Sequence, residues 1–434
     1  MPSTAIMLFT RDLRVHDNPA LHAAVSAADR VVPLFVLDDG IISLDYNRPN
    51  RARFLADSLA DLDRALKHRG GALVVRGGDV AQEVAKLADE TDADTVHLSA
   101  DYSRYAVRRE ARIRQALGNR EVHTYPGLVV APPGSITTSD GGSFSVFTPY
   151  HRRWTQHATR GLAPTPRSIT VPPGLRPGSV PSKDDICPGD VSPDVMTGGE
   201  TEARKRAKQW YDEGVQRYDD GQDSLARDDT SRLSPYLHFG CISPVELVSR
   251  ADYRRTGVAA FTRQLCWRDF HHQVLAARPD VVDTDWRTQH DRWHHDGDAL
   301  QAWKDGRTGY PLVDAGMRQL RREGWMHNRA RLVTGSFLTK HLYLDWREGA
   351  RHFFDLLVDG DVANNTMNWQ WIAGTGTDSR PNRMLNPTLQ LERYDPDGSY
   401  VKRYVEEFGT DSYPEPIVDH KAAVAAFRAA RGKD

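Results

Sequence analysis

Hydrophobic and polar positions along the first 125 residues alternate between two patterns. Short apolar runs, typical of strands that are covered on both faces, lie at Ala5–Phe9, Val31–Leu37, Ala72–Val75 and Thr95–Leu98. Helical stretches lie between and after them, at Pro19–Ala28, Arg51–His68, Val80–Asp89 and Ser103–Leu117. This alternation predicts a Rossmann-like parallel α/β sheet, whose ligands bind at the carboxyl ends of the strands.

Beyond residue 129 the pattern changes twice. Repeated Pro-Pro-Gly and Pro-Gly groups from 130 to 199 predict a long interdomain linker, in which only Phe144–Trp154 is aromatic enough to be packed. From residue 200 the pattern is helical, with Trp, Arg and His interleaved, and the chain closes on an Ala/Arg helix. We therefore expect an α/β domain over 1–129, a linker over 130–199 and an all-α domain over 200–434.

Composition narrows the class of protein. The 434 residues hold 57 basic and 59 acidic side chains, a net charge of −2, with 39% apolar residues. No run is long and apolar enough for a membrane span, and the N-terminus lacks a signal-peptide pattern, so we expect a soluble, non-secreted protein. Three scattered cysteines predict neither disulfides nor a metal site and are typical of a reducing cytosol. The near-neutral charge excludes a protein whose whole surface is basic, as in histone-like DNA binders, but it permits a basic patch on one face.

Common catalytic motifs are absent from the sequence. It contains no Walker loop, no Gly-x-Gly-x-x-Gly after the first strand, no His-Glu-x-x-His and no Gly-x-Ser-x-Gly. Gly374-Thr375-Gly376-Thr377 is glycine-rich but lacks a preceding strand, so a structural turn is the favoured interpretation.

Three segments of the C-terminal half combine residues that suit ligand binding. Thr230–Ser234 places hydroxyls and an arginine before a helix, which suits a phosphate or, more simply, a helix cap. Asp359–Trp371 joins two carboxylates and three amides to Trp369 and Trp371, which point about 200° apart on a helix. The alternative is a capped helix with two core tryptophans.

The third segment, Met317–Arg331, is rich in arginine beside aromatic residues. Such residues contact phosphates and stack on bases, although a solvated, salt-bridged helix face is an equal alternative. The arginines are Arg318, Arg321, Arg322, Arg329 and Arg331.

Seven motifs, in order and over nearly the whole chain, resemble those of the photolyase/cryptochrome family, and among its members most closely class I cyclobutane pyrimidine dimer photolyases. They are Phe9–Asn18, Thr230–Ser234, Trp267–Phe270, Gly309–Pro311, Gly324–Arg329, Asp345–Gly349 and Asp359–Trp371. The resemblance implies an α/β antenna domain and a helical domain that binds a folded FAD. It also implies a lyase that repairs DNA with blue light, in which reduced FAD gives an electron to a flipped-out pyrimidine dimer.

The resemblance assigns roles to individual residues. The FAD phosphates would be held by Tyr218, Thr230, Ser231, Arg232, Leu233 and Ser234. The rest of FAD would contact Asp359, Asp361 and Asn365, with Arg331 paired to Asp359. Electrons would pass along Trp293, Trp346 and Trp369. The lesion would contact Gln264, Trp267, Asn328 and Trp371, and flanking phosphates would contact Arg268, Arg329 and Arg383.

Two positions depart from the dimer photolyases. Gln264 stands where many bacterial enzymes have Glu, and Gln is typical of (6-4) photolyases and animal cryptochromes. However, Asn328 and Leu332 stand where (6-4) enzymes use a histidine pair, and Asn328 matches dimer photolyases. The segment near Arg383 is one residue shorter than usual.

The alternatives to dimer repair are (6-4) repair, blue-light signalling through a protein partner, or flavin binding alone. Only about 30 residues follow the helical core, which favours repair.

The resemblance extends to an antenna chromophore and to the protein's surroundings. Arg51 and Asp101 match photolyases that bind 8-hydroxy-5-deazaflavin. Methenyltetrahydrofolate is the main alternative, and an empty or FMN-filled pocket is a further one. We expect a monomer in the prokaryotic cytoplasm, associated with the nucleoid, that binds damaged double- or single-stranded DNA and uses no metal and no membrane.

Overall fold

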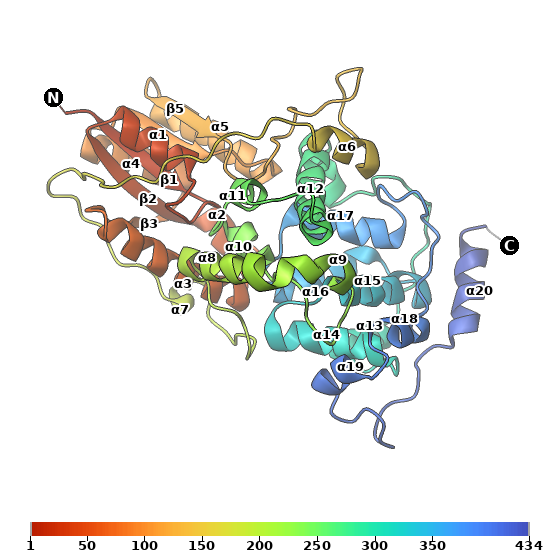
Figure 1. The fold of residues 1–434 in the computed structure, drawn as a ribbon. Coiled ribbons are helices and arrows are strands. Elements are labelled where there is room, and N and C mark those ends of the chain that lie inside the picture. The colour runs from red at the N-terminus through yellow and green to blue at the C-terminus, as the bar shows by residue number, and fades with distance from the viewer. Residues whose placement is uncertain (1, 433–434) are drawn as a thin grey trace. The chain divides into compact units, whose positions relative to one another are not determined.

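The computed structural model describes residues 2–432, and its first part contains one parallel sheet (Figure 1). The sheet has the order β3-β2-β1-β4-β5. Its strands are β1 (Thr4–Phe9), β2 (Arg30–Asp38), β3 (Val74–Gly78), β4 (Thr95–Ser99) and β5 (Glu121–Tyr125). The chain order reverses between β1 and β4, and such a reversal opens a crevice for ligands at the carboxyl ends of the strands.

Each predicted strand and helix of this part has a counterpart in the structure, although β3 begins two residues after the start of the predicted Ala72–Val75. Strand β5 and the short helix Asp39–Ile42 are additions. Only Val122 of β5 is buried. A half-exposed edge strand has no continuous apolar run, so the pattern that reveals the buried strands does not detect it.

Helices cover the sheet because its strands are apolar on both faces. Helix α1 packs against β1 and β4, while α4 packs against β2 and β3 and lies beside α5. The helices of this part are α1 (Pro19–Ala27), α2 (Asp39–Ile42), α3 (Pro49–Lys67), α4 (Val80–Thr91) and α5 (Arg104–Leu117). In α3 the buried Phe54, Leu59, Leu62 and Leu66 recur at helical spacing, as the sequence predicts.

The proline-rich segment after β5 is not featureless. It contains α6 (Phe147–Trp154) and α7 (Lys183–Ile186). Phe147, Tyr150 and Trp154 of α6 are buried, so the expectation that this aromatic stretch is packed is confirmed. Elsewhere the segment runs along the sheet, where Val31 donates to the carbonyl of Thr170 and Val75 to that of Pro177.

The remaining chain is helical, and no further strand occurs between residues 126 and 432 apart from a single bridge of His294 with Leu344. Its first elements are α8 (Glu200–Gln209), the π-helical turn η1 (Trp210–Gly214), the 3-10 turn η2 (Val215–Arg217), α9 (Tyr218–Gly221), α10 (Ser234–Phe239), α11 (Pro244–Ser249) and α12 (Thr256–Ala277). There follow η3 (Pro279–Val282), α13 (Gly297–Asp305), α14 (Pro311–Glu323), α15 (Asn328–Ser336), η4 (Phe337–His341), α16 (Trp346–Leu356), α17 (Val362–Ala373), α18 (Pro387–Tyr394), α19 (Ser399–Tyr404) and α20 (His420–Ala430). The expected α/β plus all-α fold class is confirmed.

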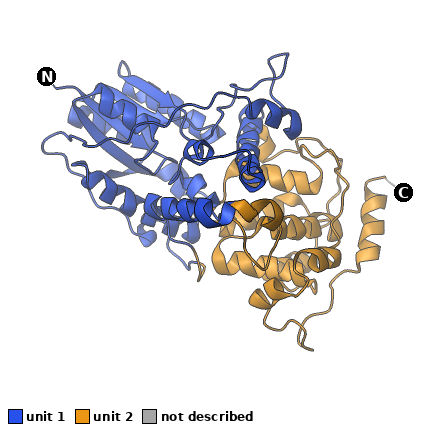
Figure 2. Cartoon of the chain, in the orientation of Figure 1, with its two compact units in different colours: residues 1–191, 196–215, 231–279 blue, residues 192–195, 216–230, 280–434 orange. Residues whose placement is uncertain are grey.

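Two compact units, coloured in Figure 2, divide these elements. Unit 1 comprises residues 1–191, 196–215 and 231–279, and unit 2 comprises 192–195, 216–230 and 280–434. The sheet, α6, α10 and α12 thus belong to unit 1, and α13 to α20 belong to unit 2. The bounds 1–129, 130–199 and 200–434 stay a prediction about domains.

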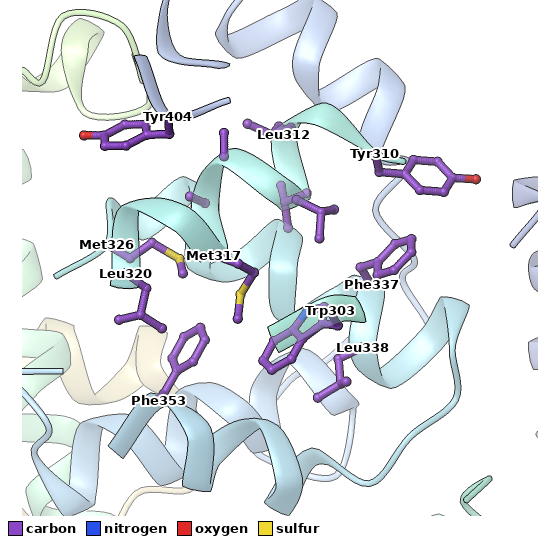
Figure 3. Packing of buried hydrophobic residues seen from close by; sticks show 14 of the residues in the cluster. Trp303, Tyr310, Leu312, Met317, Leu320, Met326, Phe337, Leu338, Phe353 and Tyr404 are labelled. Carbon is purple, nitrogen blue, oxygen red and sulfur yellow. The ribbon is translucent and has the colours of Figure 1, made fainter. Parts of the chain in front are cut away.

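The core of unit 2 surrounds a buried tryptophan (Figure 3). Trp303 is fully buried and donates from Nε1 to the carbonyl of Thr334 at 3.0 Å. Phe353 lies parallel to it at 6.1 Å, and Trp369 meets it edge-on at the same distance. Met317 and the leucines of α14, together with Met326 just after it, fill the adjoining space. This core fixes the mutual positions of α13 to α17.

Candidate functional site

Polar side chains of unit 1 gather at the carboxyl ends of β1 and β4. Arg11 follows β1 and Asp101 follows β4, on either side of the point where the strand order reverses. Their side chains form an ion pair at 3.5 Å. Burial alone would raise the pKa of Asp101, but Arg11 and Arg109 bring it below its usual value, so the carboxylate is ionised.

A short series of contacts connects Asp101 to Arg51, the other residue predicted for the antenna. Arg11 Nη2 lies 3.4 Å from His238 Nδ1, and Tyr46 Oη lies 3.2 Å from His238 Nε2. Arg51 is buried, donates to the carbonyl of Tyr46 and lies 4.5 Å above the ring of Tyr46. The structure thus brings both predicted residues into one polar network, while Arg11, Tyr46 and His238 were not predicted. Arg11 lies two residues after a buried strand, and this position at the carboxyl end of the sheet is a sequence signal for it.

The Thr230–Ser234 segment does not act as a conventional helix cap. No side chain caps the N-terminus of α10, and Ser231 Oγ instead accepts from the backbone of Leu233 at 3.3 Å. Arg232 has a positive φ of 50°, which turns the chain sharply just before the helix. The simpler interpretation as a helix cap is therefore wrong. Thr230 and Tyr218 belong to unit 2, and Ser231–Ser234 belong to unit 1.

In unit 2, the predicted cofactor residues of α15, α17 and the preceding turn form one connected group. Arg331 Nη2 donates to both carboxylate oxygens of Asp359, at 2.8 and 3.1 Å. Asp361 accepts from the backbone of Asn364 at 2.9 Å and so begins α17. The buried Asn365 donates from Nδ2 to the carbonyl of Ala350 at 3.1 Å. Asp361 therefore caps α17, as one interpretation of the sequence predicts.

The three tryptophans predicted to pass electrons all belong to unit 2 and differ in burial. Trp369 and Trp346 are 2% and 1% exposed, whereas Trp293 is half-buried. A Cβ atom on Gly349 would lie 2.2 Å from the ring of Trp369, so this glycine lets α16, which begins at Trp346, approach that ring. Trp293 packs 5.1 Å from Tyr343, three residues before Trp346. Trp346 and Trp369 thus lie on helices that contact each other, and Trp293 contacts the segment just before Trp346. The path of electrons along them stays a prediction.

Trp371 has a different environment from Trp369, as their spacing on a helix predicts. Trp371 is half-buried and lines a pocket in unit 2 with Leu332, Arg329 and Arg383. Arg329 lies 4.3 Å above the ring of Tyr394 and pairs with Asp223 at 2.6 Å. Asn328, which begins α15, is exposed, and so is Arg383.

The predicted lesion residues of α12 belong to unit 1. The ring of Trp267 stacks on Phe147 of α6 with centroids 3.6 Å apart and planes 5° apart. Arg263, one turn before Trp267, lies 5.2 Å from the centre of the Phe147 ring. Gln264, on the same helix, is half-buried. Phe147 was not predicted as a site residue, although its aromatic surroundings indicated packing.

Two charged residues fasten α12 within unit 1. Asp269 accepts from the backbone of Val130 and Ala131 and from Trp154 Nε1 at 2.9 Å. Burial raises the pKa of Asp269 to about 6. Arg268 is only 9% exposed and donates to the carbonyls of Leu128 and Leu237. The DNA contact predicted for Arg268 stays a prediction, and its guanidinium contacts the main chain here.

The arginine-rich segment forms ion pairs throughout. Arg318 pairs with Glu407, Arg321 with Asp305, Arg322 with Asp194, Arg329 with Asp223 and Arg331 with Asp359. The structure thus favours a salt-bridged interpretation for this segment as a whole. Only two of these arginines also belong to the predicted sites described above. Arg329 lines the pocket with Trp371, and Arg331 pairs with the predicted cofactor residue Asp359.

Comparison with known proteins agrees with these features. Residues 5–170 match the family described as DNA photolyase, and residues 261–411 match the FAD binding domain of DNA photolyase. The chain is 53% identical over 456 residues to a protein of Streptomyces griseus named deoxyribodipyrimidine photo-lyase, and each chain is covered completely. A protein of the same name from Halobacterium salinarum is 38% identical, with 98% of each chain covered.

Solved structures show the same fold. A bacterial class III photolyase from Agrobacterium tumefaciens is 33% identical with a TM-score of 0.93, covering 100% of this chain and 98% of its own. A Synechocystis cryptochrome is 26% identical with a TM-score of 0.91, covering 99% of both chains. The chain therefore belongs to the photolyase/cryptochrome family. The prediction that it is an enzyme of the photo-lyase type is confirmed, and its residues 261–411 are an FAD-binding domain.

The donor set fits FAD. Carboxylates, an amide and an Arg–Asp pair suit the polyol and ring edge of a flavin, while hydroxyls and an arginine before α10 suit a pyrophosphate. Asn365 uses its amide nitrogen for Ala350, and its oxygen has no donor among the described residues. Over the same residues, no helix is long and apolar enough to cross a membrane.

Proposed function

We propose that this protein repairs cyclobutane pyrimidine dimers in DNA in a light-dependent reaction. The observation that carries the proposal is the pocket of unit 2, where Trp371 and Leu332 lie beside Arg329 and Arg383. An aromatic face and an apolar side chain suit an unstacked base, and the guanidiniums suit the phosphates next to it. The name shared by the Streptomyces and Halobacterium relatives supports the same substrate.

FAD is the proposed cofactor; when bound and reduced, it would supply the light-driven electron that splits the dimer. Asp359, Asp361 and Asn365 would orient it, with Arg331 holding Asp359. The phosphates would lie on Tyr218 and on the segment from Thr230 to Ser234. Burial raises the pKa of Tyr218, so this side chain would act as a neutral hydroxyl.

Electrons would reach this cofactor along Trp293, Trp346 and Trp369. The buried Trp346 and Trp369 are shielded from water, and the half-buried Trp293 is open to an external donor. Trp369→Phe should therefore slow photoreduction of the oxidised protein while leaving repair by pre-reduced protein nearly intact. Absorbance changes under blue light measure the first and dimer loss the second. Loss of repair in the pre-reduced variant would contradict this division of roles.

The lesion would be bound after it leaves the double helix, a step that costs a few kcal/mol in unpairing and unstacking. Trp267 and Trp371 would pack against it, and Gln264 and Asn328 would donate hydrogen bonds. Gln264 can donate to a thymine carbonyl but cannot transfer a proton. Arg329 and Arg383 would bind flanking phosphates, with Arg268 as a third proposed contact.

An antenna chromophore would bind near Arg51 and Asp101. We propose 8-hydroxy-5-deazaflavin, with methenyltetrahydrofolate as the alternative. The network of Arg11, Tyr46 and His238 supports a ligand with polar edges at this position. A Sulfolobus tokodaii photolyase, 30% identical with a TM-score of 0.86, is described with two FAD molecules, so a second flavin is a further candidate. Extraction and chromatography of the native pigment distinguish these chromophores.

The remaining parts of the proposal concern the form of the protein. It would act as a monomer on damaged double- or single-stranded DNA, in the prokaryotic cytoplasm and with the nucleoid. Its domains would be 1–129 and 200–434, joined by the linker 130–199.

A second candidate function is blue-light signalling, which the match to the Synechocystis cryptochrome supports. The deciding experiment incubates fully reduced protein with dimer-containing DNA under blue light, with a dark control. Light-dependent dimer loss supports repair. An absence of loss, with FAD fully reduced, would end the repair proposal and favour signalling.

A further inference from the structure

The loop of residues 374–386, between α17 and α18, connects two of the residues proposed to contact DNA. Trp371 precedes it on α17, and Arg383 is part of it. The loop folds back on itself, because Gly374 has a φ of +81° and a Cβ atom there would lie 2.1 Å from the carbonyl oxygen of Pro381. A loop without regular structure depends on other contacts to hold such a shape.

Lys340 of η4 supplies two of those contacts from the interior. It is 3% exposed, and its Nζ donates to the carbonyls of Pro381, at 3.2 Å, and of Arg383. Burial lowers the pKa of Lys340 to about 7, and Arg431 and Arg383 contribute to the lowering. Even the neutral amine keeps two N–H groups, enough for both carbonyls. Burying a lysine costs more free energy than burying an apolar residue. We therefore expect its hydrogen bonds to this loop to have a role that an apolar side chain could not fill.

A second buried cation holds the same loop from the end of the chain. Arg431 donates to the carbonyl of Ala373 at 2.8 Å and to Asn382 Oδ1 at 3.2 Å. It is itself fixed by Asp291 at 2.7 Å, and both side chains are 2% exposed. Ser336 adds a third contact, because its Oγ accepts from the backbone of Leu385 at 3.2 Å.

These contacts hold the backbone of the loop and leave the side chain of Arg383 exposed. Lys340 and Ser336 also line the pocket that contains Trp371 and Arg383. We propose that Lys340, assisted by Arg431, is a positioning residue that fixes this loop so that Arg383 and Trp371 are held ready for the damaged strand. The inference rests on the proposed repair function. It adds an explanation of how the loop is held in its binding conformation before DNA binds. Loops held in their bound form lose less entropy on binding.

The test compares Lys340→Met with Lys421→Met, the same change at an exposed lysine of α20. Both are made in the full-length, FAD-loaded protein. For Lys340→Met we expect roughly tenfold weaker binding of dimer-containing oligonucleotide, equivalent to about 1.4 kcal/mol. The DNA concentration for half-maximal repair should rise accordingly, while the repair rate at saturating DNA and the photoreduction of oxidised FAD stay unchanged. Lys421→Met should match the unchanged protein. Equal binding by Lys340→Met and Lys421→Met would overturn the proposal.

Trypsin provides a readout that does not depend on repair. Cleavage after the exposed Arg383 should be faster in Lys340→Met than in Lys421→Met. Faster cleavage with unaltered DNA binding would overturn the positioning role and leave a purely structural one. If unchanged protein fails to bind or repair dimers, the proposed function fails, and the cleavage rates still test the loop contacts.

Asn382→Ala serves if Lys340→Met does not fold. This half-buried residue provides one of the contacts of Arg431, so its loss should loosen the loop with little effect on folding. We expect a weaker effect in the same direction on dimer binding and trypsin cleavage. Unaltered dimer binding in a folded Asn382→Ala variant with faster cleavage would overturn the proposal.

Discussion

Trp267 of unit 1 and Trp371 of unit 2 have the same proposed task but different physical support. Trp267 stacks in parallel on Phe147, and α6, which carries Phe147, is fastened to α12 by Asp269. Trp371 precedes a loop that is held by buried cations bonded to main-chain carbonyls. The stack depends on the shape and orientation of two rings, whereas the loop depends on N–H donors that reach its main-chain carbonyls. The same kind of rigidity can thus arise from different chemistry, and different substitutions should remove it.

The largest effect is expected from Asp269→Ala, which removes the acceptor that joins α6, α12 and residues 130–131. Three buried donors would lose their partner, so we expect the free energy of unfolding to fall by about 4 kcal/mol. Urea denaturation followed by circular dichroism measures this change. Asp184→Ala, at an exposed carboxylate, is the control. A loss below about 1 kcal/mol would show that α6 does not depend on Asp269.

Phe147→Ala removes the stacking partner of Trp267 and leaves the polar contacts of Asp269 in place. Phe147 is 6% exposed, so the substitution should reduce the free energy of unfolding by about 3 kcal/mol. Dimer binding should weaken as well, because Trp267 loses the ring that fixes its orientation. Denaturation and binding titrations report the two effects, with Val146→Ala at an exposed neighbour as control. Unaltered dimer binding would show that the stack on Phe147 does not orient Trp267 for the lesion.

A pH titration tests one charged contact of unit 2, the pair of Arg318 with Glu407. Arg318 holds the pKa of Glu407 at about 2, below its ordinary value of 4.5. A lowered pKa gives stability that is present above pH 4.5 and is lost as the pH falls through about 2. Glu407→Gln should therefore reduce the free energy of unfolding by about 1 kcal/mol at neutral pH, since the pair is partly exposed.

The difference between Glu407→Gln and unchanged protein should shrink as the pH falls from 4.5 towards 2. Denaturation at several pH values measures it, and Glu406→Gln at an exposed neighbour should show no such trend. A difference that is constant with pH would contradict the ion-pair explanation.

The smallest effect is expected at Gln264, which lies on α12 three residues before Trp267. Gln264→Glu restores the carboxyl group of many bacterial dimer photolyases and should raise the number of dimers repaired per absorbed photon modestly. The measurement is repair yield under calibrated blue light with fully reduced FAD. A lower yield would show that the amide is the better group here.

The sequence predicts the fold better than it predicts the surroundings of the site. Apolar runs reveal β1 to β4 because both faces of these strands are buried, whereas β5 has only Val122 buried and escapes the same test. The Trp369 and Trp371 spacing correctly predicts two different environments. Contacts between distant segments have no local pattern, so Phe147 behind Trp267, and Lys340 and Arg431 around the loop, appear only in the structure.

Charged segments show the same limit of sequence-based prediction. The arginines from Arg318 to Arg331 suit phosphate binding as well as ion pairing, and their partners lie 16 to 128 residues away along the chain. Glu407 and Asp223 illustrate this, since they are 89 and 106 residues from the arginines they pair with. Pairing can therefore be identified only after the chain is folded.

The most direct test of the central claim supplies fully reduced protein with two substrates side by side under blue light. One oligonucleotide carries a cyclobutane pyrimidine dimer, and the other carries a (6-4) photoproduct. We predict light-dependent restoration of the cyclobutane substrate and no change in the (6-4) substrate. Restoration of the (6-4) substrate alone, or of neither, would contradict the proposed function.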